Sequence, residues 1–358
     1  MEIDTQLFSV INVVRVFVIA TVSFFITIII TPFWIKFLKK YKLGKQIRTE
    51  GAPVFTSMHK KKEGTPTMGG FLIWVVILVM AVTFLILHNV YDGFWSKMNF
   101  LSRGETLLPL GAMVIAGLIG MLDDLIGIFK INPSGGGLVM RHKVLLYALI
   151  AAGGAWWFVS KLEWDLINIP FMGDFNVGLW FIPISFFIIF ATSHSANITD
   201  GLDGLAGGVF LTAFAAFGGI AFVQGRMDLA VLNAAIIGAL TAFLWFNIYP
   251  AKFFMGDTGS MALGVALGVI AMLTNAVLLL PIIGLVFVFE SLSVIIQTAS
   301  KKLRKKKLFI STPIHHHFEA KGWHETQITM RFWMISAIGA VIGLIIFLVD
   351  SKLPPFFR

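Results

Sequence analysis

Long apolar stretches alternate with short polar connections along the whole chain. Ten stretches are long enough to cross about 30 Å of hydrocarbon as helices. They cover residues 16–38, 68–88, 107–129, 143–160, 178–198, 204–223, 229–249, 258–274, 276–299 and 331–350. The first is expected to stay in the protein, because Glu2 and Asp4 stand where a secretory leader carries cations. The pattern predicts an all-α polytopic membrane protein of about ten helices, folded as one domain over residues 1–358.

Composition supports this prediction. Of the 358 residues, 57% are hydrophobic and 13% are charged, against about 25% charged in a soluble domain. So much apolar surface requires the bilayer as solvent for most of the chain. The absence of cysteine excludes a disulfide scaffold, a thiol nucleophile and a Cys-ligated metal or iron–sulfur site.

The net charge of +9 is distributed unevenly. Of the 28 Lys and Arg residues, 21 lie on alternate connections and seven lie on the others. The positive-inside rule therefore predicts that both termini are extracytoplasmic. The predicted cytoplasmic loops cover about 39–67, 130–142, 193–204, 250–257 and 300–330. Membrane topology explains the basic runs without nucleic acid, although some of them are also expected to hold anionic substrate.

Carboxylates within or beside membrane spans are costly, so each is a candidate functional group. Asp123 and Asp124 follow Leu107 by 16 and 17 residues, about 24 Å along a helix, which puts them near its inner end. Pairing with Lys130 is the simpler alternative. Adjacent helical residues point about 100° apart, so only one of the two can point straight into a given groove.

Two more acidic strings lie on the same predicted side. Asn197–Leu205 contains Asp200 and Asp203 among glycines, which permits close backbone approach, or alternatively forms an Asx-turn and a helix N-cap. Phe253–Ser260 enters the eighth span and contains Asp257. This carboxylate is expected to cap the helix, to bind a metal, or to do both.

A fourth string, Pro313–Glu319, holds three consecutive histidines in the basic inner segment. Consecutive side chains diverge, so hydrogen bonding or contact with phosphate is a better interpretation than zinc binding, and a solvated loop is the alternative. Glu290 lies inside an apolar span and is expected either to pair with a neighbouring helix or to line a groove. All four strings face one side, where hard oxygens beside Lys and His suit Mg²⁺ and phosphates.

Seven strings in fixed order resemble the polyprenyl-phosphate N-acetylhexosamine-1-phosphate transferases of the glycosyltransferase 4 family. They are Gly64–Gly70, Asp123–Asp124, Asn197–Ala206, Trp245–Asn247, Phe254–Ser260, Phe289–Val294 and Pro313–Glu319. The Asp strings are similar to the superfamily as a whole. The Pro66–Gly70 and triple-His strings resemble more narrowly its phospho-N-acetylmuramoyl-pentapeptide-transferase branch.

The resemblance implies a reaction and a setting. UDP-N-acetylmuramoyl-pentapeptide and undecaprenyl phosphate would give undecaprenyl-diphospho-N-acetylmuramoyl-pentapeptide (lipid I) and UMP, with Mg²⁺ as cofactor, in peptidoglycan biosynthesis. It also implies ten helices, a cytoplasmic-facing cleft, a homodimer and a bacterial cytoplasmic (inner) membrane, in contact with membrane lipid.

The resemblance also implies residue roles. Asp257 would be the Mg²⁺ ligand, with Asp123 and Asp124 as a catalytic pair and Asn197 and Asp200 on the polar floor of the site. The uridine pocket would comprise Lys62, Gly201, Leu202, Asp203, Asn247 and Phe254. Residues near the nucleotide and pyrophosphate would be Gln297, His315, His316 and His317. The loop after Asp124 has a Gly135–Gly137 run where relatives tend to be richer in lysine, which leaves Lys130, Arg141 and Lys143 as candidates for phosphate binding.

Three alternatives stay open at the level of sequence. A related transferase would use UDP-N-acetylglucosamine, and the triple-His string argues against it. A secondary transporter would place its acids near the midplane and often shows internal repeats, and no convincing repeat is present. A membrane protein without catalysis would tolerate Asp257→Asn. Two chemical pathways are also open, direct attack by the lipid phosphate with Asp123 as base and attack through an acyl-phosphate.

Overall fold

The computed structural model describes residues 10–44, 62–102, 104–131 and 137–352. Its helices are α1 (Val10–Lys40), α3 (Phe71–Val90), α4 (Leu107–Ile128), α5 (Met140–Lys161), α6 (Phe181–Thr199), α7 (Leu205–Val223), α8 (Met227–Asn247), α9 (Asp257–Leu273), α10 (Leu280–Ile283), α11 (Leu285–Arg304), α12 (Ile314–Ala320) and α13 (Glu325–Lys352). Short 3-10 turns cover Ser96–Met98, Gly178–Trp180 and Val277–Leu279. Ten residues that contribute to the charge and motif predictions lie outside the described residues. They are Glu2, Asp4, Lys45, Arg48, Lys60, Lys61, Arg103, Gly135, Gly136 and Arg358.

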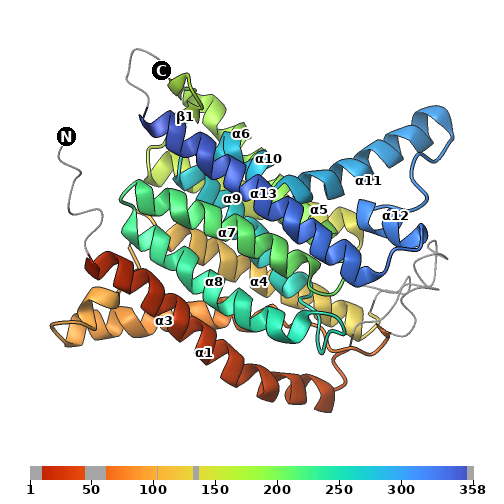
Figure 1. The fold of residues 1–358 in the computed structure, drawn as a ribbon, viewed down its shortest axis with the longest axis horizontal. Helices are drawn as coiled ribbons and strands as arrows, with labels where there is room; N and C mark the ends of the chain where they lie inside the picture. Colours follow the sequence, from red (N-terminus) through yellow and green to blue (C-terminus); the bar gives the residue numbers. More distant parts are fainter. Residues whose placement is uncertain (1–9, 45–61, 103, 132–136, 353–358) are drawn as a thin grey trace.

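The predicted membrane architecture is confirmed in outline. Within the described ranges, eight helices are long and apolar enough to span a membrane, namely α1, α3, α4, α5, α6, α7, α8 and α13. The pair α10–α11 forms a ninth, bent candidate, and α9 is apolar but has only 17 residues, about 26 Å. The protein is therefore an all-α polytopic membrane protein. The first described turn of α1 and the last turn of α13 lie at the same end of the bundle, opposite α12 (Figure 1).

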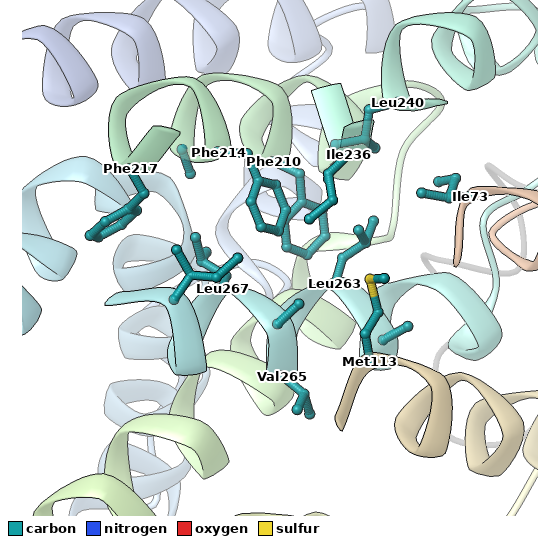
Figure 2. Close-up of a cluster of buried hydrophobic side chains, with 14 of the residues drawn as sticks. Ile73, Met113, Phe210, Phe214, Phe217, Ile236, Leu240, Leu263, Val265 and Leu267 are labelled. Atoms are coloured by element: carbon teal, nitrogen blue, oxygen red, sulfur yellow. The ribbon is translucent and has the colours of Figure 1, made fainter. Parts of the chain in front are cut away.

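Helix α9 forms the centre of the bundle, since every residue from Thr258 to Leu273 is buried. Phe210 and Phe214 of α7 pack on one side of it and Met113 of α4 on another (Figure 2). Small residues allow the closest approach, because a Cβ on Gly264 would lie 2.8 Å from the Cβ of Ala196 on α6. A helix surrounded by protein needs no lipid-matched length, which explains how a 17-residue segment is accommodated.

The stretch predicted as one helix over 276–299 is broken. Its two parts, Val277–Ile283 and Leu285–Arg304, meet at an angle of 81°. Pro281 has no backbone N–H to donate, and Gly284 leaves the helical region with φ −95° and ψ 31°. Helix α11 therefore projects away from the bundle (Figure 1), and the sequence prediction of a continuous span here is wrong.

Two further elements were not predicted. Strands β1 (Leu166–Ile169) and β2 (Gly173–Asn176) form an antiparallel hairpin in which Leu166 pairs with Asn176. The triple-His string forms the short helix α12 instead of an irregular loop. The spans predicted over 204–223 and 229–249 leave a short connection between them, and the structure agrees, since only Gln224–Arg226 separate α7 from α8.

Candidate active site

The segment before α9 is shaped by the Gly64–Gly70 string. The backbone N–H groups of Gly69 and Gly70 donate to the carbonyls of Phe254 and Met255 at 2.8 and 2.9 Å. A Cβ on Gly70 would lie 2.1 Å from the Cα of Gly259. Glycine at position 70 is therefore required by the close approach of two backbones. This contact fixes the point at which α9 begins.

Asp257 is the first residue of α9, and its carboxylate meets a cation from another helix. The Nζ of Lys143 lies 2.6 Å from Oδ2 of Asp257 and 2.8 Å from Oδ2 of Asp123. Asp123 also accepts a hydrogen bond from the Leu138 N–H at 2.7 Å. Side chains from α4, α5 and α9 thus converge on one ammonium group.

Asn197, at the end of α6, completes this cluster. Its Nδ2 donates to Oδ1 of Asp257 at 2.8 Å and to Oγ of Ser260 at 3.2 Å. The side chain of Asp257 is 19% exposed and that of Lys143 is 14% exposed. Each oxygen of the Asp257 carboxylate therefore has a partner, Asn197 for Oδ1 and Lys143 for Oδ2, and the side chain is still partly exposed to solvent.

Asp124 differs from its neighbour Asp123. It accepts hydrogen bonds from the N–H of Asp257 at 3.2 Å, from the N–H of Thr258 at 3.0 Å and from the hydroxyl of Thr258 at 2.7 Å. All three donors belong to the first turn of α9. Asp124 therefore caps that helix across the bundle, and its charge lies at the positive end of the helix dipole.

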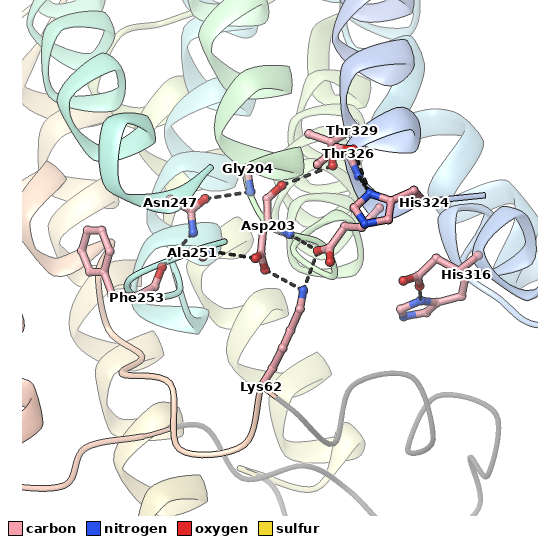
Figure 3. Close-up of polar contacts among 12 residues, drawn as sticks. Lys62, Asp203, Gly204, Asn247, Ala251, Phe253, His316, His324, Thr326 and Thr329 are labelled. Atoms are coloured by element: carbon pink, nitrogen blue, oxygen red, sulfur yellow. Dashed lines mark hydrogen bonds and ion pairs between the residues drawn. The ribbon is translucent and has the colours of Figure 1, made fainter. Parts of the chain in front are cut away.

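A second cluster joins three segments far apart in the sequence (Figure 3). The Nζ of Lys62 lies 2.7 Å from Oδ1 of Asp203 and 2.5 Å from Oε1 of Glu325. The N–H of Asp203 donates to the same Glu325 oxygen at 2.6 Å. Burial alone would lower the pKa of Lys62, but the charges of Glu325 and Asp203 raise it above its ordinary value, so Lys62 stays cationic.

Asn247 ties this cluster to the Asp257 segment. Its Oδ1 accepts from the N–H of Gly204 at 3.1 Å, and its Nδ2 donates to the carbonyl of Phe253 at 2.9 Å. The ring of Phe254 lies 5.9 Å from the Nζ of Lys62. The structure therefore brings Lys62, Asp203, Asn247 and Phe254 together, whereas Leu202 is almost fully buried and Asp200 follows the last turn of α6.

The histidines of α12 face different partners. His315 is fully buried, and its Nδ1 lies 2.9 Å from Oε2 of the equally buried Glu290, which confirms the pairing interpretation of Glu290. The Nε2 of His315 faces Gly201, where a Cβ would lie only 2.2 Å away. His316 pairs with Glu319 at 2.6 Å.

His317 and Gln297 organise the loop before α12. The Nδ1 of His317 accepts from the Ile310 N–H at 3.2 Å, and partial burial together with nearby Lys321 lowers the pKa of His317. The Oε1 of Gln297 accepts from the N–H groups of Leu308 and Phe309 at 2.9 and 3.0 Å. Gln297 and His317 therefore hold this loop in the described conformation.

Two predicted phosphate-binding cations lie apart from the acidic cluster. Lys130 and Arg141 are exposed, and within the described ranges no ion pair joins Lys130 to Asp123 or Asp124. Lys143 alone of the three reaches the carboxylates. Glu325 was missed by the sequence analysis, because an acid in the first turn of a helix is an ordinary feature.

The donor set can be compared with the needs of Mg²⁺. Among the described residues, no group of three His, Cys, Asp or Glu side chains could hold a metal alone. Two carboxylate oxygens nevertheless converge on one cation, the Lys143 ammonium. Mg²⁺ is commonly bound through one or two carboxylates plus substrate phosphates, so Asp257 and Asp123 fit a site completed by substrate.

Comparison with known proteins identifies relatives of this chain. The family model described as glycosyl transferase family 4 matches residues 106–275, which include the acidic cluster. A protein of Chloroflexus aurantiacus is 38% identical over 357 residues, covering 94% of this chain and 91% of its own length. Proteins of Geobacillus thermodenitrificans and Clostridium perfringens are 41% and 40% identical and cover 93% and 90% of this chain, and 98% and 94% of their own lengths. All three relatives are named phospho-N-acetylmuramoyl-pentapeptide-transferase.

Proposed function

Because the chain belongs to the phospho-N-acetylmuramoyl-pentapeptide-transferases, we propose that it makes lipid I for peptidoglycan. It transfers phospho-N-acetylmuramoyl-pentapeptide from UDP-N-acetylmuramoyl-pentapeptide to undecaprenyl phosphate and releases UMP. The observation that carries the proposal is the convergence of Asp123 and Asp257 on Lys143, with Asn197 bonded to Asp257, from four separate helices. The chain is similar to these transferases along more than nine-tenths of its length.

Phosphoryl transfer depends on charge neutralisation and alignment more than on covalent help from the protein. Lys143 is positioned to compensate phosphate charge once substrate separates it from its carboxylate partners. Asn197 fixes the orientation of Asp257 through Oδ1. Asp257, with Asp123 beside it, would hold Mg²⁺, which neutralises the diphosphate when bound.

The nucleotide is expected to bind beside the second cluster. Phe254 offers an aromatic face on which uracil can stack, and its ring is only partly buried. Lys62 lies within reach of the same ring. Asn247 holds the loop behind Phe254, which favours a preformed pocket over one assembled by the ligand.

Direct displacement is the pathway that the chemistry favours. The second pKa of a phosphate monoester is about 6, so undecaprenyl phosphate is mostly dianionic at neutral pH and needs little help from a base. Asp123 is the candidate base, because Asp124 uses both of its carboxylate oxygens to accept the three hydrogen bonds that cap α9. A phospho-aspartate that forms at a competent rate before lipid is added would contradict direct displacement.

Membership of this family also supports a proposal for the cellular setting. We propose a multi-pass protein of the bacterial inner membrane with ten spans, counting α9 and the bent α10–α11 pair. Both termini would be extracytoplasmic, the site would face the cytoplasm, and two chains would form a homodimer. A nucleotide sugar from the cytosol and a lipid from the bilayer can then meet at the inner ends of the helices.

An assay of UMP release by purified protein in detergent tests the function. UDP-N-acetylmuramoyl-pentapeptide should support release when undecaprenyl phosphate and Mg²⁺ are present, and UDP-N-acetylglucosamine should not. Asp257→Asn should abolish release, whereas Asp228→Asn is a matched control because Asp228 pairs with Arg15 far from the site. Transfer from UDP-N-acetylglucosamine, or full activity of Asp257→Asn, would overturn the proposal.

A further inference from the structure

Helix α11 has an inverted distribution of side chains. After its first turn, where Val286 and Phe287 are buried, its buried residues are Glu290, Ser293 and Gln297, which are all polar. Its opposite face carries large apolar side chains that are exposed. They are Phe289, Leu292, Ile295, Ile296 and Leu303, between 43% and 80% exposed. A polar face directed into the protein and an apolar face directed outward place the outer face of α11 in hydrocarbon.

The apolar face ends where a dense basic run begins. Residues 301–307 contain six cations, Lys301, Lys302, Arg304, Lys305, Lys306 and Lys307. All six are exposed, and none has an ion pair with a carboxylate of the described ranges. The sequence from Ser291 to Phe318 contains no Asp or Glu. The unbalanced charge therefore lies at the level where the apolar face of α11 stops.

We propose that residues 301–307 form a binding site for the headgroups of anionic phospholipids in the leaflet on the active-site side. The 81° bend at Gly284 carries α11 out of the bundle (Figure 1). In a bilayer this direction would bring the basic end of α11 to the membrane surface. Leu308 and Ile310, also exposed, follow the run and add apolar contact at the interface. Each Lys or Arg near an anionic surface contributes about 1 kcal/mol of attraction, so the run is more than a topology signal.

Hydrogen bonds connect this site to the candidate active site. The hydroxyl of Ser300 donates to the carbonyl of Lys306 at 2.9 Å, and Gln297 holds the backbone of Leu308 and Phe309. Glu290, on the same helix, holds His315 of α12. Headgroup binding fixes the end of α11 and thereby the position of α12. Anionic lipid should therefore accelerate transfer, a consequence that rests on the proposed function, whereas binding itself does not.

The binding experiment uses the full chain in vesicles of phosphatidylcholine with increasing phosphatidylglycerol and no substrate. Because the chain has no cysteine, Leu303→Cys gives a single attachment point for an environment-sensitive fluorophore. Phosphatidylglycerol should shift the emission of this label. Neutralising four cations, with Lys301, Lys302, Lys305 and Lys306 each changed to Gln, should weaken the apparent affinity for phosphatidylglycerol at least about tenfold.

The matched control removes four cations from the end of α1, with Lys36, Lys39, Lys40 and Lys42 each changed to Gln. These side chains are also exposed and lie on the same predicted side, so the control should leave the shift unchanged. Equal effects of the two quadruple variants, no response to phosphatidylglycerol, or a response to undecaprenyl phosphate alone would each overturn the proposal. Since the fluorescence signal needs no turnover, failure of the proposed function would appear separately, as absence of UMP release.

Discussion

Asp123 and Asp124 are adjacent in sequence, but their substitution by Asn should have different effects on stability and activity. Asp124 accepts three hydrogen bonds from the first turn of α9. An Asn side chain has one oxygen, which can keep the two bonds from Thr258, while its NH₂ group then faces the N–H of Asp257. One bond is lost, the other two lose their charge assistance, and two donors oppose each other.

The size of the effect follows from these contacts. A hydrogen bond to a charged group contributes about 1.5–3 kcal/mol, and a charge at a helix N-terminus contributes about 0.3–1 kcal/mol. Asp124→Asn should therefore cost about 2–4 kcal/mol. At the average unfolding entropy per residue this is a fall of about 3–5 °C in melting temperature. Displacement of Asp257 should reduce transfer about 100-fold.

Asp123→Asn should also reduce transfer strongly but should lower the melting temperature less, because Lys143 keeps Asp257 as an ionic partner. Thr258→Val removes one of the three donors to Asp124 and should lie between Asp124→Asn and wild type in stability. The assay is thermal unfolding in detergent together with UMP release. A melting temperature of Asp124→Asn equal to that of Asp123→Asn, with activity abolished in both, would refute the capping role.

Substitutions at three further positions test other contacts. Lys143→Gln should lose transfer, and Mg²⁺ should raise its melting temperature more than that of wild type because the ion replaces the missing cation; equal shifts would contradict this. Glu290→Gln, which keeps an acceptor for the His315 ring, should reduce kcat less than tenfold, whereas Glu290→Ala should lower both kcat and melting temperature strongly; identical behaviour would exclude a hydrogen-bonded role. Gly201→Ala should destabilise the protein and impair transfer, because its Cβ would meet His315 at 2.2 Å; a normal melting curve and rate would show that the ring moves freely.

Much of the fold was readable from the sequence because lipid imposes simple rules. Apolar length identified the helices, and the polar strings that interrupt them mark the residues that now lie around Lys143 and Lys62. The role of Lys143 could not be predicted from the sequence. Three cations near Asp124 were equivalent in sequence, and only the start of α5 at Met140 carries Lys143 to the carboxylates.

The features that the sequence did not predict depend mostly on contacts between distant segments. Glu325 reaches Lys62 from 263 positions away, and nothing local distinguishes it from any acid at a helix start. Helix α11 places Ser291 against Ser195 of α6 and Glu290 against His315 of α12. Hydropathy averages hide such polar contacts, so the stretch was predicted as one continuous span. The hairpin over 166–176 is too short and mixed in polarity to give an alternating pattern.

The central claim is that carboxylates from separate helices converge to bind a divalent cation together with the substrate diphosphate. Mn²⁺, used in place of Mg²⁺ and observed by electron paramagnetic resonance with UDP-N-acetylmuramoyl-pentapeptide present, tests it directly. One ion should bind per chain in wild type and in Asp228→Asn, and binding should be lost in Asp257→Asn. Unchanged Mn²⁺ affinity in Asp257→Asn would contradict the account.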